Sequence, residues 1–221
     1  MLARLALIRN WIFDLDNTLY PHDLRLFEQV DRRIAAYIAR MFHVDQQEAH
    51  RIQKGYFHSR GTTLAGLMAE HGVDPHQYLA DVHDIEMDML EENAPLAAAI
   101  ARLPGRKIIF TNADATYATK ILARLGLGAS FEAIHDVHAL NYTPKPDPSA
   151  YRDICDTYDL DPLESLFADD MARNLRPAKD IGMTTLWVNN GSEQAEEVTL
   201  DHVDFTTRDV THWLHDILEE A

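Results

Sequence analysis

Three short apolar runs in this sequence each end in polar side chains, and this pattern constrains the fold more than any other feature. The runs are Trp11-Ile12-Phe13, followed by Asp14; Ile108-Ile109-Phe110, followed by Thr111; and Leu166-Phe167-Ala168, followed by Asp169. Apolar runs of this length bounded by polar residues are typical of buried strands. In an open parallel sheet, ligands bind beyond the carboxyl ends of the strands. The three polar ends are therefore expected to meet in one crevice.

The rest of the chain alternates between strand and helix patterns. Strands are predicted at 11–14, 107–111, 133–137, 165–169, 185–188 and 203–205, and helices at about 113–125, 148–158, 174–181 and 210–220. This alternation predicts an α/β fold with a doubly wound, Rossmann-like parallel sheet. With 221 residues, 46% of them hydrophobic, the chain is long enough for one large domain or for a core domain that carries a smaller one.

The first and second predicted strands are separated by roughly ninety residues, which is far too long for a single crossover helix. Helices are predicted there from the spacing of Phe27, Val30, Ile34, Tyr37, Ile38 and Met41, and at 45–58, 63–71 and 75–91. We therefore expect an all-helical insert, 21–94, in a core made of 1–20 and 95–221. Paired chain crossings near Tyr20-Pro21 and Ala94-Pro95 suit a hinged cap.

Two carboxylates follow the first strand, Asp14 and Asp16. Residues i and i+2 of an extended chain point to the same side, so the two side chains can converge on one site. Their repulsion raises one pKa unless a divalent metal holds both ionised. One carboxylate can then act as a nucleophile and the other can exchange protons, as phosphoryl transfer through an aspartyl-phosphate requires. An isolated Asp-x-Asp also occurs in calcium loops and solvated turns.

Four motifs in order resemble those of the haloacid dehalogenase superfamily of phosphohydrolases, over the chain from Trp11 to about Asn189. They are Asp14-Leu15-Asp16, Thr111-Asn112, Lys145-Pro146, and Asp169-Asp170 with Asn174. The resemblance implies that Asp14 is the nucleophile, that Asp16 is the acid/base, and that Thr111, Asn112 and Lys145 bind phosphate. It also implies an Mg²⁺ site formed by Asp14, Asp170 and the backbone carbonyl of Asp16, with Asp169 either in the metal shell through water or capping the turn.

These roles agree with the chemistry of the side chains. Mg²⁺ prefers oxygen ligands and is bound through one or two carboxylates plus substrate phosphate, and a lysine is a compact point charge for phosphate. Asn112 either positions the phosphate or satisfies backbone groups at its turn. Asn174 either orients Lys145 or Asp170, or caps the following helix.

Within the superfamily, the string from Phe13 to Pro21, the loop Gly61-Thr62-Thr63-Leu64 and Asp169-Asp170 with Asn174 resemble the pyrimidine 5′-nucleotidase branch. This resemblance implies hydrolysis of UMP and CMP. The insert would then read the base, with Arg60 and Thr63 as candidate contacts. The same loop also reads as an ordinary helix start with Thr62 or Thr63 as N-cap.

Three other functions stay open. A phosphatase for another small monoester, such as phosphoglycolate or a sugar phosphate, would use the same residues. A dehalogenase would attack carbon with Asp14 but would need neither Asp16 nor magnesium. A catalytically idle phosphate-binding regulatory module would be expected to lack Asp14, Asp16 or Lys145, and all three are present.

Composition limits the partners. Twenty basic residues against 36 acidic ones give a net charge of -16 without a basic run, which argues against binding nucleic-acid polymers but does not exclude small anions. The partner that the resemblance implies is a small phosphorylated metabolite, a pyrimidine mononucleotide. The single Cys155 is predicted to be a buried thiol in a reducing compartment. The apolar start is short and interrupted by Arg4 and Arg9, so neither a signal peptide nor a membrane span is predicted, and a cytoplasmic protein is expected. Seven histidines between His22 and His83 are predicted to be surface residues.

Overall fold

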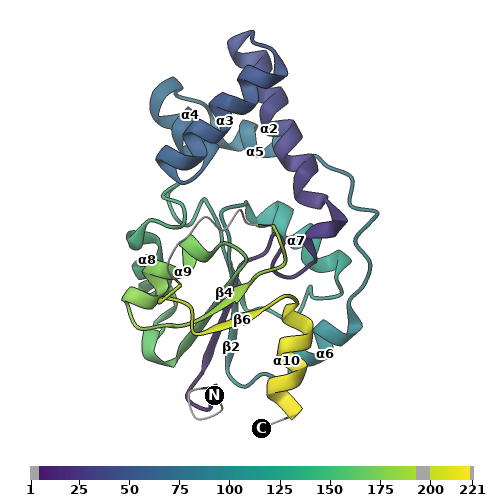
Figure 1. Ribbon diagram of the computed structural model, residues 1–221, viewed down its shortest axis with the longest axis vertical. Coiled ribbons are helices and arrows are strands. Elements are labelled where there is room, and N and C mark those ends of the chain that lie inside the picture. The colour runs from purple at the N-terminus through teal and green to yellow at the C-terminus, as the bar shows by residue number, and fades with distance from the viewer. Residues whose placement is uncertain (1–4, 193–199, 220–221) are drawn as a thin grey trace.

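The computed structural model describes residues 5–192 and 200–219. Within them, six parallel strands form one sheet, in the order β3-β2-β1-β4-β5-β6 (Figure 1). The strands are β1 (Asn10–Phe13), β2 (Arg106–Phe110), β3 (Ala133–His135), β4 (Ser165–Asp169), β5 (Thr184–Val188) and β6 (Phe205–Thr207). The predicted fold class is confirmed, and the last strand lies two residues later than predicted.

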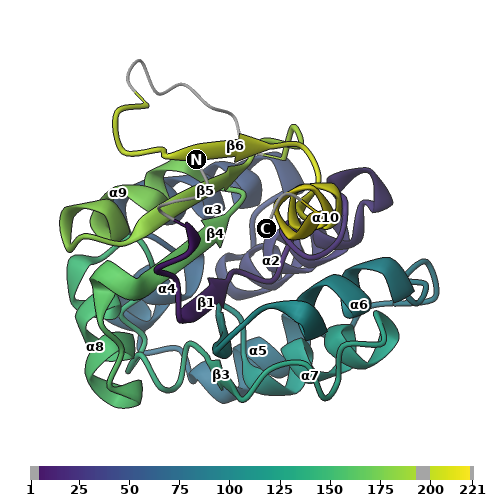
Figure 2. The same ribbon diagram turned by 90° about the horizontal axis from the view of Figure 1, so that it is seen from below.

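Helices cover both faces of the sheet. Figure 2 shows α8 (Pro148–Tyr158) and α9 (Ala172–Asp180) on one side, and α6 (Ala94–Arg102), α7 (Ala115–Arg124) and α10 (Val210–Glu219) on the other. Neighbouring strand residues alternate between the two layers: Ile12 packs with the α8 and α9 residues, whereas Phe13 packs with the opposite cluster. Because both faces are buried, the strands read as continuous apolar runs.

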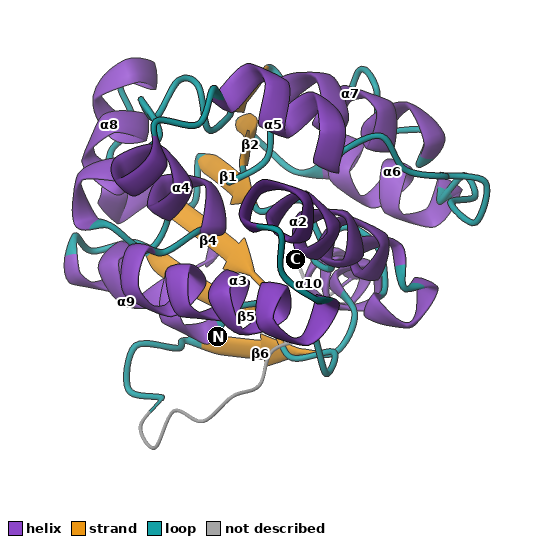
Figure 3. Ribbon diagram, turned by 90° about the horizontal axis from the view of Figure 1, so that it is seen from above, coloured by secondary structure: helices purple, strands orange, loops and turns teal. Residues whose placement is uncertain are grey.

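The segment between β1 and β2 is helical and lies over the carboxyl ends of the strands (Figures 1 and 3). The insert begins with a short 3-10 helix, η1 (His22–Leu24), and continues with α2 (Leu26–Phe42), α3 (Gln46–Arg60), α4 (Thr63–His71) and α5 (Pro75–Val82). A second 3-10 helix, η2 (Pro162–Glu164), precedes β4 in the core. Helices α3, α4 and α5 each begin after an N-cap residue whose side chain accepts a hydrogen bond from the backbone. These N-cap residues are Asp45, Thr62 and Asp74, respectively. None of the described helices is long and apolar enough to span a membrane.

One predicted helix was wrong in length and another was missed. The helix predicted at 75–91 ends at Val82, because the chain beyond it turns down to bury Met87 and Leu90 in the core cluster. Helix α6 was missed, since the Ala94-Pro95 pair was interpreted only as a chain crossing. Asn93 caps this helix by accepting a hydrogen bond from the Leu96 N–H at 3.0 Å.

The insert packs closely against the core at its base. Leu26 and Val30 of α2 belong to the core cluster of the α6, α7 and α10 face. In the other direction, Val137 from the segment after β3 packs into the apolar cluster of the insert. The boundaries predicted at 20/21 and 94/95 therefore stay predictions, because the packing does not separate the two parts at those residues.

Candidate active site

The polar residues predicted to meet do so at the carboxyl edge of the sheet, where β1 lies between β2 and β4. This is where the strand order reverses, the usual position of a ligand site in such a sheet. At its centre is Lys145, which is 1% exposed. Its Nζ donates hydrogen bonds to Asp14 Oδ1 at 2.8 Å, to Asp169 Oδ2 at 2.7 Å and to the Phe110 carbonyl at 2.8 Å.

Asp169 is fully buried and holds this lysine in place. Asn174 Nδ2 donates to both of its carboxylate oxygens, at 3.0 and 3.1 Å, and the Met171 N–H donates to Oδ1 at 2.8 Å. With Lys145 these bonds engage both oxygens from several sides. Of the alternatives left open for Asn174, the structure shows it orienting Lys145 through Asp169.

Thr18 connects the first and last motifs, a role that the sequence analysis missed. Asn17 has a left-handed backbone with φ 59, which asparagine tolerates better than most residues, and the chain then turns back on itself. The Thr18 hydroxyl donates to Asp14 Oδ2 at 3.1 Å and accepts from the Asp170 N–H at 3.0 Å. Both oxygens of Asp14 are thus held by named partners.

Asp16 points to a different set of residues. The hydroxyls of Tyr20 and Tyr117 both donate to its Oδ1, at 2.6 and 2.8 Å. Burial raises the pKa of the Asp16 carboxyl, and the two tyrosine hydrogen bonds oppose that rise. The sequence analysis had assigned no role to either tyrosine.

Thr111 and Asn112 lie where the sequence placed them, at the end of β2. The Thr111 hydroxyl accepts from the Ala113 N–H at 3.0 Å. The Asn112 amide bonds to the backbone of Lys145 twice, accepting from its N–H at 2.9 Å and donating to its carbonyl at 3.1 Å. Asn112 therefore fixes the segment that carries the lysine; its binding of phosphate stays a prediction.

Asp14, Asp169 and Asp170 form a buried carboxylate cluster whose nearest oxygens all lie within 4.8 Å of one another. Burial raises the pKa of Asp14 to about 7, with Lys145 opposing and Asp169 adding to the rise. Burial, then Asp169 and Asp14, raise the pKa of Asp170 well above its usual value. Three buried carboxylates thus lie close together, and the Lys145 ammonium group bonds to two of them, Asp14 and Asp169.

This donor set fits a divalent cation, because it offers hard oxygen ligands and excess negative charge. The oxygens of Asp169 are already engaged with Lys145, Asn174 and a backbone N–H. Asp14 and Asp170 are therefore the carboxylates best placed to hold a cation.

Arg60 and Thr63 are the residues of the insert that were predicted to contact the substrate. Within the part of the chain that the structure describes, neither contacts the residues of the carboxylate cluster. Arg60 is exposed and pairs with Glu70 at 3.4 Å. Thr63 is 5% exposed, and its hydroxyl bonds to the Gln53 carbonyl at 3.3 Å inside the insert. The N-cap of α4 is Thr62, one of the two alternatives considered for this loop.

Gly61 and Phe57 are the residues of this part of the insert that reach the core. The Gly61 carbonyl accepts from Arg173 Nη2 at 3.4 Å, and the Arg173 guanidinium lies 4.0 Å from the centre of the Phe57 ring. A Cβ on Gly61 would lie 3.1 Å from Pro144 Cγ, next to Lys145. The loop 60–63 therefore lies directly over the lysine segment.

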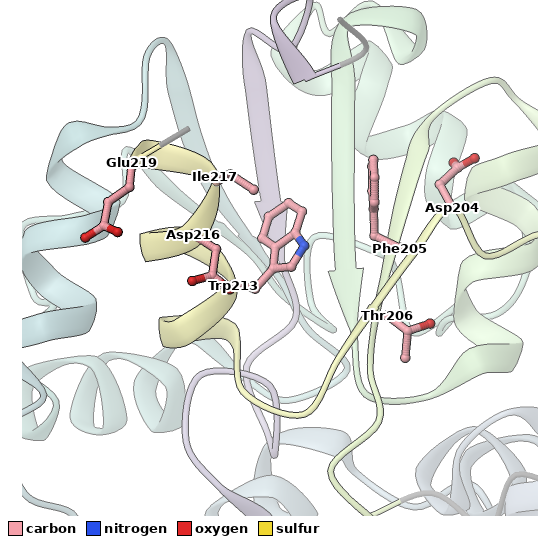
Figure 4. Close-up of a pocket in the computed structure, with 7 residues that line it drawn as sticks. All are labelled: Asp204, Phe205, Thr206, Trp213, Asp216, Ile217 and Glu219. Atoms are coloured by element: carbon pink, nitrogen blue, oxygen red, sulfur yellow. The ribbon is translucent and has the colours of Figure 1, made fainter. Parts of the chain in front are cut away.

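A hollow of about 670 Å³ lies between β6 and α10 at the far edge of the sheet. Figure 4 shows Trp213 and Phe205 lining it, with Asp204 and Asp216 nearby. None of the predicted site residues contributes to it, so it is separate from the candidate active site.

Comparison with known families identifies the class of protein. The model of the haloacid dehalogenase-like hydrolases matches residues 8–182, and this chain belongs to that family. Phosphate metabolism protein 8 of Saccharomyces cerevisiae is 25% identical over 193 residues, covering 78% of this chain and 59% of that protein. Enolase-phosphatase E1 of Shewanella frigidimarina is 26% identical over 139 residues, 61% of this chain and 56% of that one.

A shorter match is 41% identical to mouse bifunctional epoxide hydrolase 2 over 54 residues, which is 24% of this chain and 10% of the relative. The chain thus spans between a tenth and about three fifths of the length of these curated relatives.

Solved structures share the fold. A phosphatase of the family from Thermococcus onnurineus has a TM-score of 0.63 at 17% identity, with 96% of this chain and 98% of that chain covered. The hydrolase YfnB of Bacillus subtilis, solved with magnesium bound, has a TM-score of 0.61 at 15% identity, with 95% and 98% covered. The L-2-haloacid dehalogenase of Xanthobacter autotrophicus has a TM-score of 0.58 at 18% identity, with 97% and 100% covered.

Proposed function

We propose that this protein is a magnesium-dependent phosphomonoester hydrolase that acts through an aspartyl-phosphate. The proposal rests on the contacts of Asp14. Lys145 donates a hydrogen bond to one of its carboxylate oxygens, Thr18 donates to the other, and Asp170 lies in the same buried cluster. A carboxylate held this firmly next to a fixed ammonium group is prepared to approach an anionic phosphate.

In the first step, a carboxylate oxygen of Asp14 attacks phosphorus and the bond from phosphorus to the ester oxygen breaks. Asp16 gives its proton to that oxygen, so the alcohol leaves and Asp14 carries the phosphoryl group. In the second step, water attacks phosphorus, its proton passes to Asp16, and the bond to Asp14 breaks. Inorganic phosphate is released and both carboxyl groups return to their starting state.

Asp14, Asp170 and the Asp16 carbonyl are the groups that we propose to hold Mg²⁺. When bound, Mg²⁺ supplies charge that offsets the repulsion between the Asp14 carboxylate and the dianionic phosphate. The magnesium found in YfnB supports this choice of metal. Lys145 stabilises the charge of the transferring phosphoryl group, and Asp169 with Asn174 keeps the lysine in position.

The dehalogenases among the structural neighbours make carbon–halogen cleavage the competing reaction. That reaction needs no proton for its leaving group, whereas this site holds Asp16 with two tyrosine hydroxyls and surrounds Asp14 with further carboxylates. These features favour the phosphatase. Phosphatases are also named among the relatives and the structural neighbours.

For the substrate, we propose a pyrimidine mononucleotide, UMP or CMP, with another small monoester such as phosphoglycolate or a sugar phosphate as the alternative. The proposal rests on the motif strings shared with the nucleotidase branch. It also treats the insert, 21–94, as the cap that selects the leaving group, with the loop 60–63 over the Lys145 segment as the part nearest the phosphate site.

The test is release of phosphate from UMP, CMP, AMP, phosphoglycolate, a hexose phosphate and 4-nitrophenyl phosphate, with magnesium and with a chelator. Release of chloride from 2-chloropropionate is measured in parallel. We expect magnesium-dependent phosphate release with a preference for UMP and CMP. A preference for another ester would remove the nucleotidase assignment alone, and chloride release without phosphatase activity would remove the whole proposal.

A further inference from the structure

The two tyrosine hydroxyls on Asp16 leave its two oxygens in different situations. Tyr20 and Tyr117 are 2% and 1% exposed, and both donate to Oδ1, at 2.6 and 2.8 Å. No hydrogen bond to Oδ2 is found among the described residues. Two donors occupy the acceptor capacity of Oδ1, so a proton on this carboxyl group belongs on Oδ2.

Two residues outside the four motifs, Asp114 and His83, hold Tyr117 in place. Its backbone N–H donates to Asp114 Oδ1 at 2.9 Å, where Asp114 caps helix α7. The other oxygen of Asp114 lies 2.5 Å from His83 Nδ1. The His83 ring is stacked on the Tyr117 ring, with the ring centres 4.2 Å apart and the planes 18° from parallel.

His83 comes from the far end of the insert. It is the C-cap of α5, the last helix of the insert, and its side chain is 11% exposed. The prediction that it is a surface residue was wrong, because its ring is enclosed between the insert and α7. The contact sequence His83, Tyr117, Asp16 therefore joins the segment leaving the insert to the carboxyl group proposed as the acid/base.

We propose that Tyr117 is a positioning residue for Asp16, and that His83 ties the orientation of Tyr117 to the position of the insert. The proposal rests on the proposed phosphatase function. The tyrosine hydroxyls need not touch the substrate: by occupying Oδ1 they hold the carboxyl group in one orientation, with Oδ2 left to exchange the proton with the leaving oxygen. This arrangement serves both protonation states, since Oδ1 accepts the same two bonds in each.

The test separates protonation of the leaving group from every other contribution to the rate. Phosphorylation of Asp14 is followed in single-turnover, rapid-quench experiments with an alkyl ester, the best substrate of the panel, and with 4-nitrophenyl phosphate. The nitrophenolate ion is a weak base and leaves without a proton, whereas an alkoxide is a strong base and needs a proton to leave. Loss of an acid's orientation therefore slows the alkyl ester selectively.

The main variant is Tyr117→Phe, which keeps the ring and removes the hydroxyl. We expect the rate with the alkyl ester to fall roughly tenfold or more relative to the rate with 4-nitrophenyl phosphate, the effect of one hydrogen bond to a charged group, and substrate affinity to stay the same. His83→Ala is expected to act in the same direction, and His83→Phe, which retains a stacking ring, to recover part of the loss. Tyr158→Phe, at the end of α8, is the matched control.

Equal slowing of both esters by Tyr117→Phe, or no slowing, would overturn the positioning role. If Tyr117→Phe does not fold, as judged by circular dichroism and melting temperature, the His83→Ala and His83→Phe pair gives the same comparison, and equal rates for both esters overturn it there. Wild-type protein that forms no phosphoenzyme from either ester would instead overturn the proposed function. The two failures are therefore distinguishable.

Discussion

Replacing Asp170 by asparagine should have opposite effects on stability in the metal-free and magnesium-bound protein. In the absence of metal, the substitution removes one charge from a buried cluster whose oxygens lie within 4.8 Å of one another. At that separation and an effective dielectric constant of about 20, two ionised carboxylates repel by about 3.5 kcal/mol. Burial is the largest cause of the raised pKa values of Asp14 and Asp170, and the neighbouring Asp169 carboxylate adds to both rises.

We therefore expect metal-free Asp170→Asn to be more stable than wild type by about 1–3 kcal/mol near pH 8, or roughly 3–10 °C in melting temperature for a chain of this size. Magnesium should reverse the order. At a hundred times its dissociation constant a ligand stabilises the folded state by about 2.7 kcal/mol. Wild type should gain this amount, and the variant, which has lost a carboxylate ligand, should gain little.

The assay is thermal unfolding of both proteins in chelator and in a magnesium titration. Asp169→Asn is the control, because it removes a charge of the same cluster but also a 2.7 Å ion pair with Lys145; we expect it to be less stable than wild type with and without metal. A lower melting temperature of metal-free Asp170→Asn, or an equal magnesium response in wild type and variant, would refute the reasoning.

Three further predictions concern Asp14 and the glycines Gly61 and Gly72. Because burial raises the folded-state pKa of Asp14 from 3.8 to about 7, the folded protein retains a proton that the unfolded chain has released, so metal-free stability should fall as pH rises from about 4 to about 7; urea unfolding across that range checks it, and a flat profile would contradict it. Asp14→Asn should abolish phosphate release and leave the circular dichroism spectrum unchanged. Turnover by the folded variant would exclude Asp14 as the nucleophile. Gly61 has φ +82, and the Cβ of Gly61→Ala would lie 3.1 Å from Pro144 Cγ, so this variant should weaken substrate binding several-fold by displacing its loop. Gly72→Ala, at φ +62 with no neighbour within 4 Å of its Cβ, should only lower stability by about 1 kcal/mol. Steady-state kinetics of the two variants show whether the effect on substrate binding comes from the contact with Pro144 or from backbone strain alone.

The sheet and the central site residues could be predicted because their signals are local. Each buried strand is a continuous apolar run, and the residue after it lies at the edge where ligands bind. Asp14, Thr111 and Asp169 follow from this rule once the runs are found, whereas the role of Asp170 came from the motif resemblance. Lys145 has no strand of its own before it, and its placement was expected from the motif resemblance.

The contacts made by the insert could not be predicted in this way. Periodicity reports which face of a helix is buried but not what it meets, so Tyr117 reads as an ordinary buried position of α7, although its hydroxyl bonds to Asp16, 101 positions away in the sequence. The same limitation explains Thr63, whose hydroxyl turns into the insert. The early end of α5 at Val82 depends on the burial of Met87 and Leu90 in the core, which is a tertiary contact.

The alternation rule also stops being informative at Asp14 itself. Strand β1 ends at Phe13, and the chain then turns, with the Thr18 N–H donating to the Leu15 carbonyl at 3.3 Å. As a result, Asp14 bonds to Lys145 and Thr18, whereas Asp16 bonds to the tyrosines beneath the insert. The partners of Asp14, Thr18 and Lys145, lie outside the insert, whereas Tyr117, one of the two partners of Asp16, is stacked on His83 of the insert. Movement of the insert should therefore change proton transfer to the leaving group while leaving the nucleophile in place.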